Sequence, residues 1–273
     1  MTGWVNFNGS LEEQGTALFT AGSRAFRYGD GLFETMRALD GNIRLRELHF
    51  ERLFEGMARL QIKLPITDSF LQKQVMRTIE KNKIKGEARV RLTVFRGEGG
   101  LYETDGPGSG YLIQAWSMQH KDKINENGLV TGVYTAAAKN CDALANIKSN
   151  NYLVYVMAAL HAKNNLWNDC IVLNNHGRVC EATIANIFWI KGEKIFTPPL
   201  TEGCVAGVMR RHLLETLPGK GFVLEERAAI SDDIENADEV FLTNAVSGIR
   251  WVREMNGHEF GNKISTLLFR STF

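Results

Sequence analysis

Strand-like and helix-like segments are interleaved along this chain, without the regular strand–helix–strand alternation of a doubly wound sheet. The clearest local signal is a hairpin, in which apolar runs at 32–39 and 42–45 flank Asp40-Gly41, a dipeptide typical of tight β-turns. A helical pattern follows at once, because apolar residues recur on one face over 46–62. The pattern therefore predicts an α+β fold rather than a doubly wound α/β sheet.

A polar stretch separates two groups of such segments. Residues 119–123 lack periodicity, so we expect a linker at 119–124 between an N-terminal α+β domain (1–118) and a C-terminal α+β domain (125–273). In the first domain we also expect strands at 4–7, 89–95 and 111–116 and a helix at 69–82. In the second domain we expect strands at 128–136, 170–173, 187–190, 194–196, 222–226, 239–242 and 247–253, and helices at 151–163 and from 206 onward.

The composition excludes several classes of protein. The chain has 32 Lys and Arg against 31 Asp and Glu, whereas a general nucleic-acid binder needs a large basic excess. No stretch reaches the roughly 18 apolar residues of a membrane span, and the N-terminus has no signal-peptide pattern. The cysteines, at 141, 170, 180 and 204, form no CxxC pair. We therefore expect a cytoplasmic protein with reduced thiols that binds neither nucleic acid nor membrane.

Three motifs that carry chemistry in other proteins are incomplete here. The stretch Arg96-Gly97-Glu98-Gly99-Gly100 resembles a phosphate loop, but it lacks the Lys-Ser/Thr pair of a Walker motif and does not open a helix. The six histidines include no HExxH and no paired ligand spacing, so we expect no metal site. Ser149 and Ser247 do not lie in GxSxG, which disfavours an α/β-hydrolase.

A long run in the second half carries the strongest functional signal. Its pieces at 181–188 (EATIANIF), 195–197 (IFT) and 205–210 (VAGVMR) resemble the signature of the class IV pyridoxal-phosphate-dependent aminotransferases. That family includes branched-chain aminotransferases, D-amino-acid aminotransferases and aminodeoxychorismate lyases. Other family-like segments occur in order at 28–35, 49–53, 148–153 and 239–245.

The resemblance carries implications for the whole protein. It implies the two-domain fold type IV, similar to that of the D-amino-acid aminotransferases. It also implies pyridoxal 5′-phosphate as the cofactor and small amino and keto acids as partners. Finally, it implies a homodimer, in which an active site between the two domains is completed by the neighbouring subunit.

Pyridoxal phosphate requires an amine that forms a Schiff base, and the resemblance assigns this catalytic role to Lys148. Ser149-Asn150 look like caps for the helix at 151–163, and a helix N-terminus would favour the neutral, nucleophilic amine. Taken alone, Lys148 would be read as a solvated surface lysine, and the family match reverses that choice. Tyr152 lies four residues later, and its hydroxyl is expected either to approach the cofactor's 3-oxygen or to lie in the core.

By resemblance, Glu181 is the carboxylate that keeps the pyridine nitrogen of the cofactor protonated, so that the ring can accept electrons. It follows a strand-and-turn unit at 172–179, and by itself it would be read as an exposed glutamate at a strand end. Asn186 and Thr183 also fill positions of the signature. They either contact the cofactor or only hold the turn beside Glu181.

The phosphate of the cofactor requires fixed donors. The resemblance makes Arg52 a phosphate clamp, and a guanidinium can donate to two phosphate oxygens at once. Gly207-Val208-Met209 opens a helix, whose backbone N–H groups and dipole favour an anion. Thr243-Asn244-Ala245 follows a strand and can add hydroxyl and amide donors from a turn. Each of these features is also common as plain structure, so none decides alone.

The first half departs from the specificity motifs of two branches of the family. Phe33 stands where D-amino-acid aminotransferases have tyrosine, and 95–102 departs from the Arg-Pro-rich segment of the branched-chain enzymes. The Arg-Gly-x-Gly-Gly sequence from Arg96 and the run at 29–35 look more like the aminodeoxychorismate lyases. The candidate substrate-facing residues are Tyr28, Phe33, Arg37, Arg96 and Tyr102. Of these, Arg37 and Arg96 could hold a carboxylate or be solvated strand arginines.

Two reactions are compatible with the same catalytic residues. An aminotransferase would move an amino group between an amino acid and a 2-keto acid, with Lys148 as the proton carrier. A lyase would use the same proton abstraction to expel pyruvate from aminodeoxychorismate and so produce 4-aminobenzoate. A non-catalytic protein that reuses the fold would have lost Lys148 or Glu181, and both are present. We expect transamination, because it is the broader activity of the family.

Overall fold

The computed structural model describes residues 3–103, 108–119 and 123–272, and the chain forms two compact units. The first unit comprises Met1–His120 and Lys148–Asn151, and the second comprises Lys121–Ile147 and Tyr152–Phe273. The predicted linker at 119–124 lies partly outside the described residues. Lys148–Asn151 were predicted to lie in the C-terminal domain, whereas these four residues group with the first unit.

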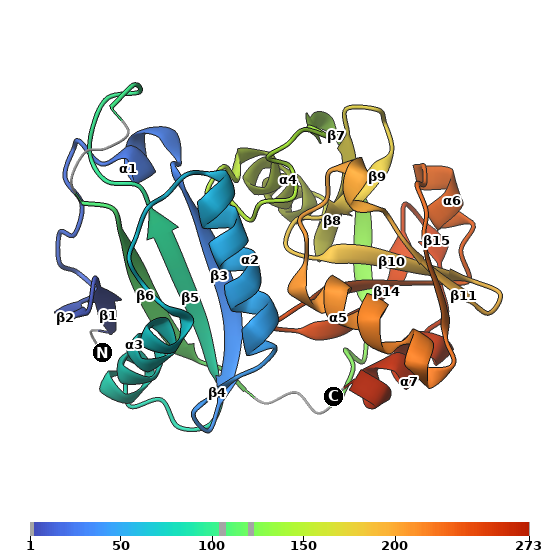
Figure 1. The fold of residues 1–273 in the computed structure, drawn as a ribbon. Coiled ribbons are helices and arrows are strands. Elements are labelled where there is room, and N and C mark those ends of the chain that lie inside the picture. The colour runs from blue at the N-terminus through green and yellow to red at the C-terminus, as the bar shows by residue number, and fades with distance from the viewer. Residues whose placement is uncertain (1–2, 104–107, 120–122, 273) are drawn as a thin grey trace. The chain divides into compact units, whose positions relative to one another are not determined.

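The first unit is a six-stranded sheet with two long helices, α2 and α3, on one face (Figure 1). The strand order is β2-β1-β6-β5-β3-β4, and neighbouring strands are antiparallel. The strands are β1 (Trp4–Phe7), β2 (Ser10–Glu13), β3 (Gly31–Leu39), β4 (Asn42–Ile43), β5 (Ala88–Phe95) and β6 (Gly110–Ser117). The helices are α1 (Arg24–Tyr28), α2 (Arg46–Arg59) and α3 (Asp68–Lys81). The core lies between the sheet and the buried Leu53, Leu71 and Val75 of the two long helices.

The predicted hairpin between β3 and β4 is confirmed. The two strands pair antiparallel, and the turn residues Asp40 and Gly41 have φ of 48° and 81°. Positive φ at both central residues is the geometry of a type I′ turn, whose twist matches that of the flanking strands.

Helix α2 ends three residues earlier than the pattern over 46–62 predicts. Gln61 adopts a left-handed φ of 55°, and the backbone N–H of Ile62 donates to the carbonyl of Met57 at 2.9 Å. This is the geometry of a Schellman motif, which closes a helix by pairing its last carbonyls. The apolar periodicity continues past the helix because Ile62 folds back onto the core, where it is 4% exposed.

The second unit is built on a nine-stranded sheet in the order β12-β11-β10-β13-β14-β7-β8-β9, with β15 paired to β14. The strands are β7 (Leu129–Lys139), β8 (Asp169–Asn174), β9 (Val179–Ala182), β10 (Asn186–Lys191), β11 (Lys194–Thr197), β12 (Val223–Glu226), β13 (Glu239–Asn244), β14 (Gly248–Met255) and β15 (His258–Glu259). The α-helices are α4 (Leu153–Asn164), α5 (Val208–Thr216), α6 (Ser231–Glu235) and α7 (Lys263–Thr272), with short 3₁₀ turns at Leu200–Glu202 and Pro218–Lys220. Helix α4 packs on β7 and β8, α5 packs on β13, and α7 packs on β13 and β14.

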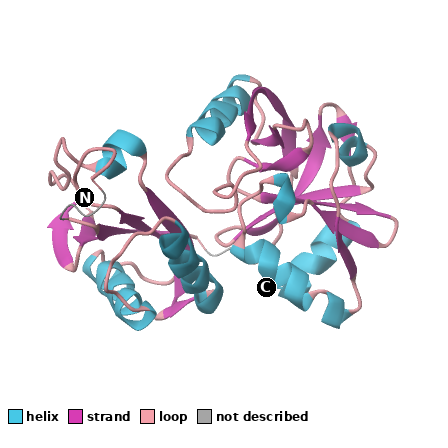
Figure 2. Cartoon of the chain, turned by 45° about the horizontal axis from the view of Figure 1, so that its top comes forward, coloured by secondary structure: helices cyan, strands magenta, loops and turns pink. Residues whose placement is uncertain are grey.

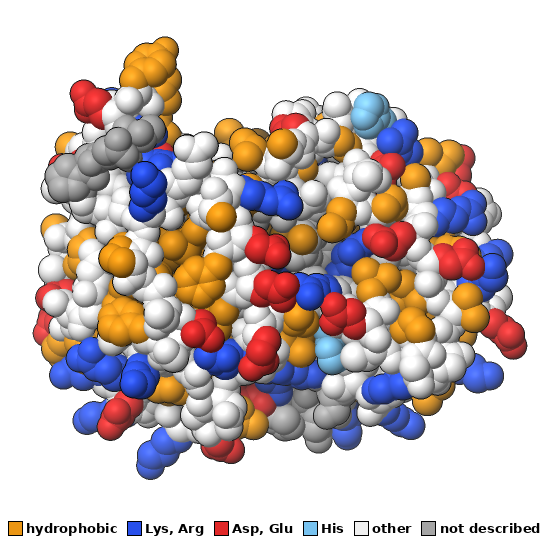
Figure 3. All heavy atoms as spheres, in the orientation of Figure 1, with side chains coloured by type: hydrophobic (Ala, Val, Ile, Leu, Met, Phe, Trp, Pro, Cys, Tyr) orange, Lys and Arg blue, Asp and Glu red, His pale blue; other side chains and the backbone are white. Residues whose placement is uncertain are grey.

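The α+β prediction is confirmed, because both units combine sheets with helices (Figure 2). Six elements were not predicted from the sequence: β2, α1, β9, α6, β15 and α7. All of them have five residues or fewer except α7. Short elements carry too few residues for a periodic pattern. On the face drawn in Figure 3, basic and acidic side chains are interspersed. Among the described residues, no helix combines the length and the apolar character that crossing a membrane requires.

Candidate functional site

Glu181 lies at the centre of a buried hydrogen-bond network in the second unit. It is part of β9 rather than following a strand as predicted, and it is 3% exposed. Its Oε1 accepts from Lys139 Nζ and from the Tyr155 hydroxyl, both at 2.7 Å. The backbone N–H of Val205 donates to Oε1 at 3.0 Å and to Oε2 at 3.1 Å, and Asn186 Nδ2 lies 3.4 Å from Oε2. We call these five residues the Glu181 centre.

The energetic cost of burying Lys139 and Glu181 is offset by their opposite charges. Burial alone would lower the pKa of Lys139, but the Glu181 carboxylate raises that pKa above its ordinary value. Burial and the same carboxylate raise the pKa of Tyr155 far above its ordinary value, so its hydroxyl remains a donor. Lys139 is therefore a cation, and the network is arranged to hold an anion at Glu181.

Two further predicted site residues, Gly207 and Thr243, lie beside Asn186. Its Nδ2 also donates to the carbonyl of Val205 at 3.0 Å, which holds the loop that leads into α5. Gly207 is the N-cap of α5, and a Cβ there would lie 1.8 Å from Asn186 Oδ1, so only glycine permits this approach. Asn186 pairs in register with Thr243 on β13. The structure thus brings together Asn186, Gly207 and Thr243.

The Thr243 hydroxyl is a polar group whose partner is not among the described residues. The side chain is 1% exposed, and its Oγ1 has no hydrogen-bond partner in the part of the chain that the structure describes. Val208 and Met209, the first two residues of α5, are also buried. An unpaired hydroxyl and a glycine-opened helix N-terminus in one unit are suited to an anionic group.

The remaining signature residues hold turns. Thr183 donates its hydroxyl to Asp169 Oδ1 at 2.6 Å, and its backbone N–H donates to the same oxygen at 3.1 Å, which fixes the turn after β9. Asn244 ends β13, and its Oδ1 accepts from the backbone N–H groups of residues 246 and 247. Ala245 lies within that turn and is half-buried. Tyr152 directly precedes α4, and its hydroxyl donates to the carbonyl of Thr183 at 3.3 Å.

In the first unit, Arg52 lies on α2 as predicted and forms a bidentate pair with Glu34 of β3. Its Nε is 2.7 Å from Oε1, and its Nη2 is 2.5 Å from Oε2. His49, one turn earlier, places Nδ1 2.6 Å from Oε2 of the same carboxylate. Burial alone would raise the pKa of Glu34, but Arg52 and His49 lower it to about 2. Glu34 is therefore ionised near neutral pH and fixes the guanidinium plane of Arg52.

Lys148 belongs to a short extended segment that pairs with β3. Its carbonyl accepts from the backbone N–H of Phe33 at 2.9 Å, and the N–H of Asn150 donates to the carbonyl of Gly31 at 2.9 Å. A Cβ on Gly31 would lie 2.7 Å from Asn150 Nδ2, so the glycine allows the segment to approach. Lys148 Nζ lies 4.5 Å from the centroid of the Phe33 ring.

The predicted helix caps after Lys148 are wrong. Ser149 forms a bridge with Leu32, and α4 begins only at Leu153. The cause of the error is that a Ser-Asn pair favours caps, while strand pairing with β3 takes these residues instead.

The two candidate arginines already bind carboxylates of their own unit. Arg37 is 8% exposed and pairs with Glu87. Arg96 Nε lies 2.8 Å from Asp30 Oδ2, and its Nη1 donates to the carbonyl of Gln61 at 3.1 Å. Neither is a solvated strand arginine, and both are fixed by opposite charge.

The other substrate candidates differ in burial. Phe33 is 4% exposed, whereas the Tyr102 side chain is 95% exposed. Tyr28 ends α1, and the guanidinium of Arg24 lies 5.3 Å from the centroid of its ring. Residues 104–107, in the glycine-rich stretch that follows Arg96, lie outside the described residues.

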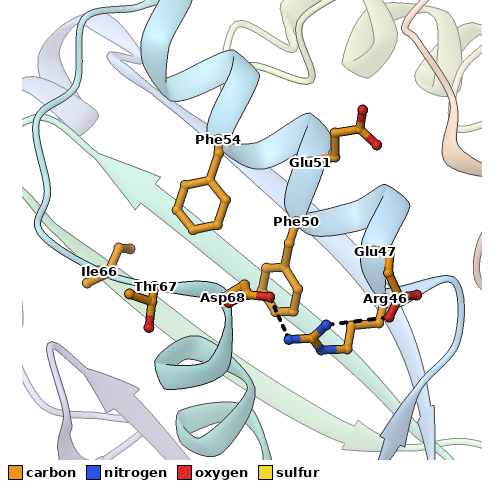
Figure 4. A pocket seen from close by; sticks show the side chains of 8 residues that line it. All are labelled: Arg46, Glu47, Phe50, Glu51, Phe54, Ile66, Thr67 and Asp68. Carbon is orange, nitrogen blue, oxygen red and sulfur yellow. Dashed lines mark hydrogen bonds and ion pairs between the residues drawn. The ribbon is translucent and has the colours of Figure 1, made fainter.

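A surface hollow of about 600 Å³ lies elsewhere in the first unit, between α2 and the start of α3 (Figure 4). Phe50 and Phe54 point into it from α2, and Arg46 bonds Asp68 at its rim at 2.7 Å. None of the residues that line it was predicted as a site residue.

Three residues of these networks were not given a role from the sequence. Lys139 was overlooked because the strand was expected to end at 136, whereas β7 runs to Lys139. Tyr155 lies just after the family-like segment at 148–153. A tyrosine at such a position is usually interpreted as a core residue. Glu34 lies within the quoted run at 28–35, so its place in a family-like segment was an available signal.

Comparisons with known proteins agree along most of the chain. Residues 31–255 match the family model described as "Amino-transferase class IV". An aminodeoxychorismate lyase from Vibrio harveyi is 33% identical over 246 residues, which cover 89% of this chain and 89% of the relative. A D-alanine aminotransferase from Bacillus licheniformis is 28% identical over 262 residues, which cover 94% of this chain and 90% of the relative.

A solved structure has the same fold. The crystal structure of a branched-chain aminotransferase from Thermoproteus uzoniensis with norvaline is 25% identical and has a TM-score of 0.87. The similarity covers 100% of this chain and 93% of that chain. Because the family model spans most of the sequence and this fold covers all of it, the chain belongs to the class IV aminotransferases, pyridoxal-phosphate-dependent enzymes of fold type IV.

Proposed function

We propose that this protein is an aminotransferase that moves an amino group between an amino acid and a 2-keto acid. The cofactor of the family is pyridoxal 5′-phosphate, and the residues present fit it. A buried carboxylate suits a protonated ring nitrogen, and Glu181 is held ready by four donors. The unpaired Thr243 hydroxyl and the N-terminus of α5 at Gly207 suit a phosphate.

The proposed cofactor contacts come from both units. Lys148 would be joined to the cofactor's aldehyde carbon, and Arg52 would clamp the phosphate in the orientation that Glu34 imposes. From the second unit, Glu181, Thr243 and the backbone of Gly207-Val208-Met209 would hold the ring nitrogen and the phosphate. The further proposed contacts are Tyr152, Asn186, Asn244 and Ala245. We also propose that the two units are the two domains of the enzyme.

When bound, the cofactor withdraws electrons from the substrate's α-carbon, which makes the α-proton acidic. Released as a free amine, Lys148 takes that proton at Nζ and passes it on. Its segment is anchored by two backbone hydrogen bonds to β3, so the flexible side chain moves from a fixed base. Lys139 and Tyr155 both donate to Glu181 Oε1, so the carboxylate is held in a fixed position for the ring nitrogen.

The arginine pairs favour transamination over the lyase reaction. Aminodeoxychorismate carries two carboxylates, whereas a simple amino donor has one. Arg37 and Arg96 are the predicted carboxylate holders, and each is already neutralised by Glu87 or Asp30. A dianionic substrate would require both arginines to exchange partners. The lyase remains the second candidate because the relative at 33% identity is an aminodeoxychorismate lyase.

A half-reaction distinguishes the two activities. Mixed with an amino acid and no acceptor, the cofactor-loaded protein should convert its cofactor to the amine form and release one equivalent of keto acid. The reason is that an aminotransferase stops after the first half of its cycle. Absorbance follows the cofactor, and chromatography identifies the keto acid across a panel of L- and D-amino acids.

The control is aminodeoxychorismate under the same conditions. A lyase regenerates its starting form at each turnover and produces pyruvate and 4-aminobenzoate. An unchanged spectrum with every amino acid, together with production of 4-aminobenzoate, would replace transamination by the lyase assignment. No bound cofactor and no product in either arm would instead support a non-catalytic protein.

We also propose a homodimer, for which the outer face of α4 provides support. Leu153, Val156, Met157 and Leu160 are between 45% and 73% exposed and recur at helical spacing, so they form an apolar stripe. Light scattering should give twice the 30.6 kDa mass of one chain. The double change Val156→Glu and Leu160→Glu should shift the mass toward one chain, while Lys163→Glu on the same helix should not. A single-chain mass for the unaltered protein would refute the dimer.

We propose a cytoplasmic location, supported by the four cysteines, all of which are free thiols in the structure. Burial raises the pKa of all four thiols, which makes them poorly reactive. Fractionation of cells tests the location directly.

A further inference from the structure

Lys139 is a buried cation bonded to the residue proposed to hold the cofactor's ring nitrogen. It ends β7, its side chain is 12% exposed, and Nζ lies 2.7 Å from Glu181 Oε1. Lysine is rarely buried to this degree without a specific partner. The contact therefore places a positive charge directly on the Glu181 carboxylate.

The two oxygens of Glu181 are used unequally. Oε1 accepts from Lys139, from Tyr155 and from one branch of the Val205 N–H. Within the described residues, Oε2 has only two donors. They are the Val205 N–H, which is shared between the two oxygens, and Asn186 Nδ2 in a longer contact of 3.4 Å. With three donors, Oε1 already exceeds its two lone pairs, whereas the two contacts of Oε2 are one branch of a shared N–H and one long contact, so Oε2 can still accept a strong donor.

Few other charges act on this pair. Tyr155 faces it from α4, Cys180 from β9, and Cys204 from the loop before α5. Burial raises the pKa of Cys204 to about 12, and it raises the pKa of Cys180 strongly, so both thiols are neutral. Lys139 and Glu181 are therefore the charged members of the cluster.

We propose that Lys139 is a positioning residue that keeps Glu181 ionised and reserves its Oε2 for the ring nitrogen of the cofactor. This inference rests on the proposed role of Glu181. A proton shared between a buried carboxylate and a pyridine nitrogen can lie on either one, and low polarity favours the neutral arrangement. The charge of Lys139, bonded directly to the carboxylate, favours the ionised carboxylate and so places the proton on the nitrogen.

The test is ¹⁵N NMR of the holoenzyme loaded with cofactor labelled at the ring nitrogen. In the unaltered protein and in Lys139→Arg, the nitrogen should be protonated. In Lys139→Met, the ratio of protonated to unprotonated nitrogen should fall roughly tenfold, as for a change of about one pKa unit. In the same variant kcat should fall with KM for the amino donor nearly unchanged, and Lys139→Arg should restore it.

Two further variants make the result specific. Lys194→Met removes another lysine–glutamate pair with the same 2.7 Å contact, but about half of each side chain is exposed, so the nitrogen signal should not move. Lys139→Gln keeps a donor for Oε1 without the charge, so it carries the test if Lys139→Met does not fold. It should show the same fall in protonation.

The outcomes separate this inference from the proposed function. If Glu181→Gln shifts the nitrogen signal but Lys139→Met and Lys139→Gln leave it unchanged, Lys139 is merely structural and the inference is wrong. If Glu181→Gln itself leaves the signal unchanged, Glu181 is not the ring-nitrogen partner, and the proposed site fails first.

Discussion

Lys148→Ala should abolish turnover, lowering kcat by about a thousandfold or more. The substitution removes both the amine that binds the cofactor covalently and the group that moves the α-proton. Borohydride reduction of the unaltered holoenzyme should fix the cofactor to the peptide that contains Lys148, and mass spectrometry of a digest identifies that peptide.

The structure supplies the control for this experiment. Lys163, an exposed lysine on α4, should be replaceable by alanine without loss of turnover or labelling. The backbone hydrogen bonds between the Lys148 segment and β3 do not depend on the side chain at 148, so Lys148→Ala should retain the fold and the melting temperature. A label on another lysine, or turnover retained in Lys148→Ala, would rule out this assignment.

Glu181→Gln should keep the cofactor bound but slow proton abstraction roughly a hundredfold or more, because an amide cannot hold the ring nitrogen protonated. A kinetic isotope effect on a donor deuterated at the α-carbon measures that step. Glu239→Gln is the matched control, since Glu239 is also buried but accepts hydrogen bonds from the first turn of α7. It should affect stability without changing the isotope effect.

Arg52 should give the opposite pattern. Arg52→Lys retains a positive charge beside Glu34 but loses the bidentate fork, so it should weaken cofactor binding with little change in the chemical step. Arg52→Ala should cost about 1.5–3 kcal/mol of binding for a lost charged hydrogen bond. It also removes one partner of the buried Glu34 carboxylate, so stability must be measured alongside. Weak binding in Glu181→Gln together with slow chemistry in Arg52→Lys would mean that the two roles are exchanged.

The periodic and turn-forming parts of the fold follow from the sequence. Asp40-Gly41 predicts a hairpin because both residues tolerate positive φ, and the structure has them at 48° and 81°. The strand at 89–95 is β5 to within one residue, because its apolar residues alternate. Element ends were harder: β7 continues to Lys139 because backbone pairing with β8 continues there, at Lys139–Asn174, beyond the apolar run. Pairing with a distant strand leaves no local signal.

The candidate site likewise has one part that was predicted from the sequence and another part that was not. Glu181, Asn186 and Gly207 were identified because the family signature has a fixed order, and the structure brings them together with Thr243. The partners of Glu181 could not be identified in this way. Lys139 and Tyr155 reach Glu181 from β7 and α4, which lie outside the signature. The unpaired Thr243 hydroxyl is likewise a property of packing, which composition and spacing do not encode. The roles assigned to these residues stay predictions until the variants above are measured.

The pairing of Lys148 with β3 has a consequence for how the protein folds. The bridge between Leu32 and Ser149 joins residues far apart in the sequence, so it closes a long loop at an entropic cost. Such contacts are slow to form, and during synthesis this one must wait until the chain beyond Ser149 has emerged. The proposed catalytic lysine is thus set in place late, by the first unit, although its chain neighbours fold with the second. Local opening of this one short segment would free the lysine while both hydrophobic cores stay intact. On heating, we therefore expect loss of the cofactor to precede loss of secondary structure.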